Sequence, residues 1–229
     1  MAVAPQYAKP PIKEAIFAIT FKEVIPENML DRFTSNPFIS ESFSTGTGPA
    51  DGYRLTPKDN KNRSIQIAPT YLSYHNFNQY AGWETMFEEF KHIWLLFCKT
   101  VGNITLSQLS VRYINQIPIP FPLSQEQLAG YTNLMVTIPA GFNPDVTNFF
   151  VQVQVPNREG TLMGIITETL LPNEVDPAKL LLLLDLTVAK AGEFDCDKAG
   201  LWESFLEIRG YKNDLFEKCI TPLTRNLFD

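Results

Sequence analysis

The chain has 229 residues, 45% of them hydrophobic, and a formal charge of −6 from 25 acidic and 19 basic residues. This length and composition suffice for a substantial core in one large domain or two fused halves. The acidic balance argues against a surface built mainly to bind the phosphate backbone of nucleic acid, although a local basic patch stays compatible with it.

Cysteine usage and hydropathy indicate the compartment. Cys98, Cys196 and Cys219 form no CxxC pair and no even framework, which favours free thiols in a reducing environment. The first residues lack the apolar core of a signal peptide, and the most apolar run, 180–186, is far shorter than the ~20 residues that span a bilayer. We therefore expect a cytoplasmic protein with no membrane segment.

The first part of the chain alternates in the manner of β-strands. A half-buried strand is predicted over Glu14–Lys22. Pro26 suits the first turn of a short helix, which Asn36 and Pro37 are expected to end. Closely spaced strands are then predicted at Ser40–Thr45, Gly52–Thr56, Arg63–Ala68 and Tyr71–His75. Such tight spacing is typical of an antiparallel meander.

A long amphipathic helix is predicted over Trp83–Val101. Its apolar stripe recurs at helical spacing and consists of Trp83, Met86, Phe87, Phe90, Trp94, Phe97 and Val101. A face this aromatic is expected to pack on a sheet, so we interpret the stripe as core.

The second part repeats this order. A long strand is predicted over Ile104–Ile119, and Ser124 with Gln127 forms a capping-box pattern for a short helix. Further strands are predicted at Asn133–Ile138, Phe149–Val155, Thr161–Leu170 and Leu180–Val188. A final helix is predicted over Gly200–Ile220, with a kink or break at Gly210, because glycine costs ~1 kcal/mol relative to alanine inside a helix.

The two long helices also match each other. Aligning Trp83 with Trp202 without gaps pairs Glu84 with Glu203, Glu88 with Glu207, Leu96 with Leu215, Phe97 with Phe216 and Lys99 with Lys218. We therefore predict an α+β fold with a duplicated β-α-β4-α unit, whose halves are 1–102 and 103–229. That order resembles the TATA-binding-protein-like and helix-grip architectures, in which long helices back a curved antiparallel sheet.

The opposite face of such a sheet would be open to a partner. Alternation puts these residues on it: Thr20, Lys22, Ser64, Gln66, Arg112, Gln116, Gln152, Gln154, Asp185 and Thr187. A DNA-binding saddle would carry more Lys and Arg and more apolar wedges, so the architecture does not imply DNA binding.

Charged residues on the predicted strands have two interpretations. Glu14, Arg112 and Asp185 can form a structural ion pair, or Arg112 can hold a ligand's carboxylate or phosphate. The candidate binding residues are Arg112, Gln116, Gln152, Gln154, Glu14 and Asp185. The run Tyr71, Tyr74, His75, Phe77 and Tyr80 is likewise either core and sheet rim or a patch that binds protein.

Three segments are similar to a known group of proteins. KPPIKEAIFAITF at Lys9–Phe21, VRYINQIPIP at Val111–Pro120 and LFEKCIT at Leu215–Thr221 resemble a sporadically distributed, uncharacterised prokaryotic family. The resemblance covers nearly the whole chain, but that family has no established activity. It implies only that the following residues occupy the family's patterned positions: Pro10, Pro11, Glu14, Ala15, Arg112, Tyr113 and Asn115.

No catalytic signature is recognisable. His75 and His92 have no neighbouring motif, and His92 is expected to pack within its helix. The cysteines lack a paired His/Asn signature, and the phosphate-binding glycine motifs and GxSxG are missing. Asp195, Cys196 and Asp197 are consecutive, so they cannot easily converge on one ion. We expect no catalytic residue, metal or cofactor.

The leading hypothesis is therefore a non-enzymatic binding or interaction module, such as a regulatory or immunity-type component of a bacterial locus. It predicts a protein partner or a homo-oligomer, with neither nucleic acid nor membrane as partner. The alternative is a small-ligand sensor or carrier with a pocket between sheet and helix, and the third hypothesis is an uncharacterised hydrolase.

Overall fold

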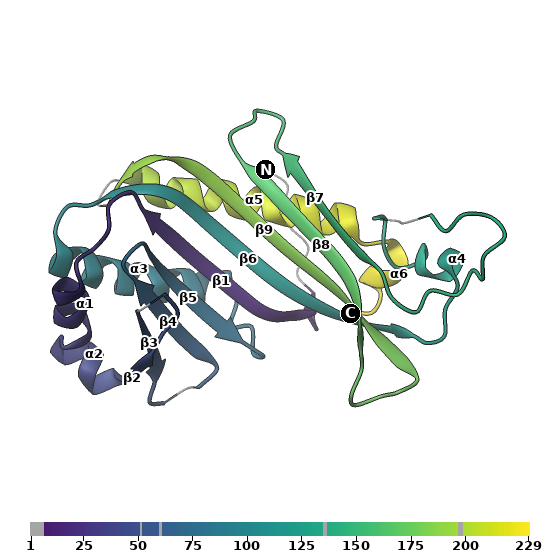
Figure 1. Ribbon diagram of the computed structural model, residues 1–229, viewed down its shortest axis with the longest axis horizontal. Helices are drawn as coiled ribbons and strands as arrows, with labels where there is room; N and C mark the ends of the chain where they lie inside the picture. The colour runs from purple at the N-terminus through teal and green to yellow at the C-terminus, as the bar shows by residue number, and fades with distance from the viewer. Residues whose placement is uncertain (1–6, 51, 60, 135–136, 197–198) are drawn as a thin grey trace. The chain divides into compact units, whose positions relative to one another are not determined.

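The computed structural model describes residues 7–50, 52–59, 61–134, 137–196 and 199–229 (Figure 1). Its strands are β1 (Ile12–Phe21), β2 (Phe43–Thr47), β3 (Tyr53–Pro57), β4 (Arg63–Ala68), β5 (Tyr71–Phe77), β6 (Thr105–Pro120), β7 (Phe150–Pro156), β8 (Met163–Pro172) and β9 (Lys179–Asp195). Its helices are α1 (Glu27–Thr34), α2 (Pro37–Ser42), α3 (Trp83–Val101), α4 (Gln125–Leu128), α5 (Ala199–Cys219) and α6 (Pro222–Arg225).

The strands form one antiparallel nine-stranded sheet in the order β2-β3-β4-β5-β1-β6-β9-β8-β7. From its middle, the order runs β1-β5-β4-β3-β2 to one edge and β6-β9-β8-β7 to the other. The α+β class is therefore confirmed. Among the described residues, none of the helices combines the length and apolar character needed to span a bilayer.

The residues cluster into two compact units. One consists of Glu14–Arg112 and Ala189–Ile208, and the other of Met1–Lys13, Tyr113–Val188 and Arg209–Asp229. Strands β6 and β9 and helix α5 each contribute residues to both units.

Aromatic side chains form the core of the unit that contains α3. Phe17 of β1 stacks on Phe90 of α3 with ring centroids 5.4 Å apart, and it meets Phe205 of α5 edge-on at 6.1 Å. Trp94 is fully buried, and its Nε1 donates to the carbonyl oxygen of Cys196 at 2.9 Å. The predicted aromatic stripe is thus core, and α3 has the predicted bounds.

Close approach of α5 to β8 organises the other unit. A Cβ atom on Gly164 would lie 2.5 Å from Cδ1 of Leu215, so only glycine fits there without a shift. The Tyr211 hydroxyl donates to the carbonyl oxygen of Val155 on β7 at 3.0 Å. Helix α5 is continuous through Gly210, so a break at this residue, one of the two predicted outcomes, does not occur.

The strand predicted at Ser40–Thr45 is wrong in its first half. Residues 40–42 belong to α2, and β2 begins only at Phe43. The Asn36 side chain accepts a hydrogen bond from the Phe38 amide at 3.0 Å, and Pro37 occupies the first helical turn. Asparagine at the N-cap followed by proline is a helix-start signal, so Asn36 and Pro37 begin α2 as well as following α1.

The strand predicted at Asn133–Ile138 is not found in residues 133–134 and 137–138, and residues 135–136 lie outside the described chain. Asn133 Nδ2 donates to the carbonyl oxygens of Lys218 at 2.9 Å and Ile220 at 3.1 Å. Thr132 forms an isolated bridge with Ile220. The chain is therefore tied to the end of α5. The capping box at Ser124 and Gln127 is confirmed, whereas α6 was not predicted.

Candidate binding cleft

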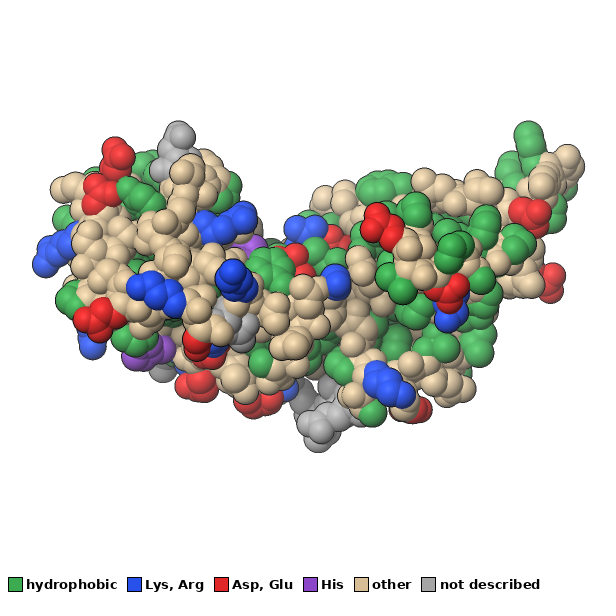
Figure 2. All heavy atoms as spheres, turned by 90° about the horizontal axis from the view of Figure 1, so that it is seen from below, with side chains coloured by type: hydrophobic (Ala, Val, Ile, Leu, Met, Phe, Trp, Pro, Cys, Tyr) green, Lys and Arg blue, Asp and Glu red, His purple; other side chains and the backbone are tan. Residues whose placement is uncertain are grey.

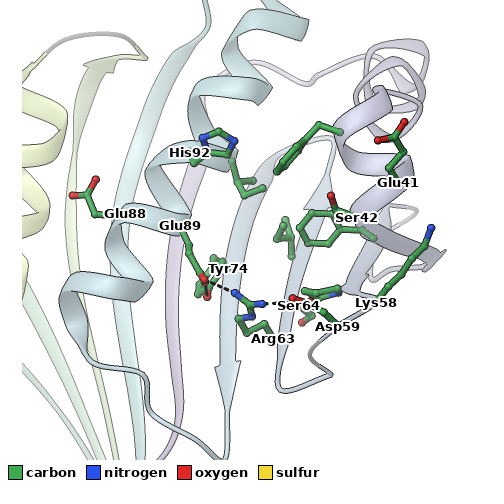
Figure 3. Close-up of a pocket in the computed structure, with 15 residues that line it drawn as sticks. Glu41, Ser42, Lys58, Asp59, Arg63, Ser64, Tyr74, Glu88, Glu89 and His92 are labelled. Atoms are coloured by element: carbon green, nitrogen blue, oxygen red, sulfur yellow. Dashed lines mark hydrogen bonds and ion pairs between the residues drawn. The ribbon is translucent and has the colours of Figure 1, made fainter.

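A cleft of about 680 Å³ lies beside α3 in the unit that contains this helix (Figure 3). One wall is α3, with Glu89, His92 and Ile93. The floor comes from β4 and β5, and the far wall from α2 and the residues that follow β3. Sites for small molecules commonly enclose roughly 300–1,000 Å³.

An ionic cluster lies at the base of the cleft. The Glu89 carboxylate accepts hydrogen bonds from the Arg63 guanidinium and from the Tyr74 hydroxyl (Figure 3). Arg63 also reaches Asp59, with Nη2 3.5 Å from Oδ1. Three elements, β4, β5 and α3, are therefore joined through Glu89.

Tyr74 is the buried member of this cluster, and one donor of Arg63 is left without a partner among the described residues. Desolvation, and then the hydrogen bond and charge of Glu89, raise the pKa of Tyr74 well above its ordinary value, so the phenol stays protonated. Arg63 Nε is buried and has no hydrogen-bond partner within the described structure. An unpaired buried donor costs about 1–3 kcal/mol, which a bound acceptor or water would recover.

The rim of the cleft combines an aromatic side chain with unneutralised charge. Phe38 of α2 is 43% exposed and meets the His92 ring edge-on, with centroids 5.1 Å apart. His92 is thus exposed on α3 instead of packed within it, which corrects its expected role. The charged lining residues are Glu41, Asp59, Glu88 and Glu89 against Lys58 and Arg63. Carboxylates outnumber cations, so the lining is acidic.

Two of these charges are directed elsewhere. Glu88 pairs with Lys91 at 2.7 Å and points away from the ionic cluster in Figure 3. Lys58 Nζ donates to the carbonyl oxygen of Ser40 at 3.0 Å, which ties the end of β3 to α2. Glu41 lines the cleft from α2 and is exposed, so its carboxylate is accessible to a cation.

A second group of hydrogen-bonded polar side chains links β1 and β5. His75 Nδ1 lies 2.8 Å from Glu14 Oε1, and Nε2 lies 3.0 Å from Ser73 Oγ. A neutral ring satisfies both contacts by donating from Nδ1 and accepting the serine hydroxyl at Nε2. The connectivity of acid, base and hydroxyl is that of a nucleophilic triad.

The surroundings of Glu14, His75 and Ser73 do not suit nucleophilic catalysis. Ser73 is 4% exposed, so a substrate carbonyl has little access to Oγ. Strand β5 pairs with β1 on one side and β4 on the other, so its amides belong to the sheet ladder and are not free to form an oxyanion hole. We interpret these three side chains as a structural network that holds β1 and β5 in register.

The predicted binding residues lie on the sheet and do not line the cleft. Arg112, Gln152 and Gln154 are exposed, whereas Gln116, Asp185 and Glu14 are partly buried. The structure joins Glu14 to His75, and Gln152 Nε2 donates to Thr167 Oγ1 at 3.0 Å. In the strand order, β9 and β8 separate β6, with Arg112 and Gln116, from β7, with both glutamines. The six residues therefore do not form one cluster.

The aromatic run predicted as either core or protein-binding patch is divided. Tyr74 and His75 are buried, while Tyr71 and Phe77 are half-buried. Tyr74 contributes its hydroxyl to the floor of the cleft, where the sequence interpretation had not placed a site.

Buried ionisable groups occur in the other unit. Glu168 of β8 is 1% exposed, and burial raises its pKa to about 7 against a lowering contribution from the Thr132 hydroxyl. Lys212 of α5 lies over the Tyr113 ring, with Nζ 3.8 Å from the centroid, and burial lowers its pKa to about 7. Neither was singled out from the sequence.

The cysteines form no disulfide with one another: this holds for Cys98, Cys196 and Cys219. Burial, followed by the charge of Glu168, raises the pKa of Cys219 to about 12. Within the described ranges, no group of three or more His, Cys, Asp or Glu residues could hold an ion. Asp197 lies outside these ranges.

Surface charge is mixed. On the face seen in Figure 2, the described Lys and Arg side chains lie among Asp and Glu side chains. Hydrophobic side chains also gather on this face, toward the part of the chain that holds α4 and α6. Binding at this face would therefore depend on local contacts more than on a broad field of one sign.

The chain was compared with protein-family models and with curated proteins. No family model matches the chain, and the search of curated proteins gives no match.

Proposed function

We propose that the chain is a non-enzymatic binding module and that the cleft beside α3 holds a basic and apolar segment of a partner protein. The cleft itself is the observation that carries this proposal. Its ionic base is fixed by Arg63, Glu89 and Tyr74, so binding would not have to order these groups. Preorganised sites retain more of their interaction energy as affinity.

The character of the lining supports this partner. Phe38 is an exposed aromatic side chain on which an apolar or cationic group can pack. Glu41 supplies an accessible carboxylate, and acidic lining residues outnumber basic ones. A segment with Lys or Arg beside an apolar residue complements both features.

We also propose that the halves 1–102 and 103–229 arose by duplication of one β-α-β4-α unit, with α3 and α5 as equivalent helices on a curved sheet of the TATA-binding-protein-like or helix-grip kind. The strand order supports this: β1 and β6 lie in the middle, and the last strand of each half, β5 or β9, lies beside its first. The second half would then have replaced its counterpart of β2 by the segment that Asn133 ties to α5. The three cysteines form no disulfide, which fits action in the cytoplasm, and the resemblance of three segments to an uncharacterised prokaryotic family fits a bacterial locus.

Selection from a displayed random peptide library tests the cleft. We expect enriched peptides to carry Lys or Arg next to apolar side chains. Phe38→Ala and Glu41→Lys should each weaken their binding by roughly tenfold or more, because the first removes an exposed aromatic contact and the second reverses the charge that meets the cation. Isothermal titration calorimetry of the full chain measures the change.

Two matched variants serve as controls. Phe142→Ala removes another exposed phenylalanine, and Glu174→Lys reverses another exposed charge, and neither residue lines the cleft. Both should bind like the parent chain. The proposal is wrong if enriched peptides are acidic, or if the cleft variants bind as well as these controls.

A small-ligand sensor or carrier is the second candidate, and the volume of about 680 Å³ favours it. The same acidic and aromatic lining would then select organic amines. A thermal-shift screen with a metabolite library separates the two candidates: an amine that raises the melting temperature of the parent but not of Glu41→Lys, with no peptide enrichment, supports the small ligand.

A further inference from the structure

Strand β7 forms an edge of the sheet that lacks the usual protection against pairing. Its sequence, FVQVQVP over Phe150–Pro156, contains no charged residue, and its proline stands at the end. Phe150 is 68% exposed. Val155 of the same strand and Met163 of the neighbouring strand β8 are also exposed. Natural edge strands are normally shortened, charged or interrupted, because their free backbone groups pair with other strands.

The opposite edge differs. Strand β2 is five residues long and contains Gly46, which weakens a strand. It also covers the outer side of β3. In the described sheet, β7 has no such strand beyond it. The backbone groups of β7 that face away from β8 are thus available to another chain.

The sequence of β7 is complementary to itself. An antiparallel pair of β7 strands centred on Val153 sets Val153 opposite Val153, Val151 opposite Val155, and Gln152 opposite Gln154. Each of these three kinds of pair joins two β-branched side chains or two amides, both of which stabilise a sheet, and no like charges meet. At the ends of the strand, Phe150 lies opposite Pro156. An isologous dimer requires such a self-complementary surface.

We propose that two copies of this chain pair through β7 to form a homodimer with one sheet continuous across the two-fold axis. The occupant is a second copy because residues 151–155 of the strand match themselves pair by pair, and β7 carries no charge that would select a different partner. This inference is independent of the cleft, which is lined by other residues.

Sedimentation velocity of the full-length chain tests the dimer. We expect the parent chain to sediment as a dimer and Val153→Lys to raise the dissociation constant by roughly 100-fold or more, because two ammonium groups then face each other at the axis. Val153→Thr keeps a β-branched side chain and should remain a dimer. Circular dichroism and the melting temperature verify that each variant is folded.

A variant at the other edge makes the result specific. Thr45→Lys places the same charge on the exposed face of β2 and should leave the dimer intact. A monomeric parent chain overturns the proposal. So does a dimer that Thr45→Lys disrupts while folded Val153→Lys leaves it unchanged.

Cross-linking tests the register. Under oxidation in a Cys98→Ser background, Val153→Cys should give a disulfide-linked dimer, whereas the background chain, whose Cys196 and Cys219 are buried, should not. A mixture of Gln152→Cys and Gln154→Cys should link more than either variant alone, because these positions face each other across the axis. Equal linking in the mixture and in the separate variants would contradict this register.

Discussion

At the scale of single residues, Glu168 links stability to pH. Its carboxyl group is buried on β8, where Thr132 Oγ1 lies 2.7 Å from Oε2. A protonated Glu168 can donate to this oxygen, while the Thr132 hydroxyl donates to the carbonyl oxygen of Cys219 at 3.3 Å. The neutral carboxyl therefore fits the site, in agreement with its raised pKa.

Because the pKa of Glu168 rises from 4.5 to about 7 on folding, the folded chain holds the proton more tightly. The associated stability is fully present below pH 4.5 and is lost as the pH rises through about 7. The loss amounts to about 3 kcal/mol. Glu168→Gln cannot titrate, so urea denaturation at a series of pH values should show a flatter dependence for this variant over that window.

Glu159→Gln is the control, because it makes the same replacement at an exposed position. This variant should show the same pH dependence as the parent. Lys212 affects stability in the opposite sense, since its lowered pKa costs stability as the pH falls from 10.5 through about 7. The comparison of Glu168→Gln with the parent cancels this contribution. Coincident pH curves for the two chains would show that Glu168 is not held neutral in the fold.

Alternation in the sequence places Gly164, Ile166, Glu168 and Leu170 on one face of β8, so a buried glutamate could have been noticed. The partner of Glu168 could not have been predicted, because Thr132 is far from it in sequence and immediately precedes the segment 133–138, for which a strand was predicted. The same limit applies to the cleft: Arg63, Tyr74 and Glu89 are unremarkable separately, and only the packing of α3 on the sheet brings them together.

At the scale of elements, α2 sets one wall of the cleft. It contributes Phe38 and Glu41, and its first turn depends on the Asn36 side chain. We expect Asn36→Ala to reduce the free energy of unfolding by about 1 kcal/mol, because the Phe38 amide loses its acceptor. The same variant should weaken peptide binding, since the wall that carries Phe38 becomes less ordered.

Asn36→Asp is the matched control, because aspartate also accepts at an N-cap and should keep both stability and binding. Urea denaturation and calorimetry give the two readouts. If Asn36→Ala and Asn36→Asp are equally stable, the cap does not hold α2 in place.

Elements with a strong periodicity were predictable, and elements with a mixed signal were not. The α3 stripe is long and aromatic, so its bounds agree with the sequence pattern. Asn36-Pro37 can either follow a helix or begin one, and here it does both within a few residues. The segment at 133–138 alternates like a strand in the sequence, but Asn133 hydrogen-bonds to the end of α5, and the described residues 133–134 and 137–138 form no strand.

At the scale of the whole molecule, two features have different origins in the sequence. An antiparallel sheet was expected from the order of elements, and the structure shows that the strands of both predicted halves belong to one sheet. The cleft combines residues from α2, the turn after β3, β4, β5 and α3, which alternation alone cannot align. The predicted binding residues and the observed cleft therefore differ.

Binding in the cleft is tested most directly by titrating the chain, labelled at its isoleucine methyl groups, with a peptide enriched by the display selection. Ile65 and Ile93 line the cleft, whereas Ile119 lies on β6 outside it. We predict that the NMR signals of Ile65 and Ile93 shift with added peptide and that the Ile119 signal stays in place. Shifts confined to Ile165 and Ile166 of β8, or an unchanged spectrum, would contradict binding in the cleft.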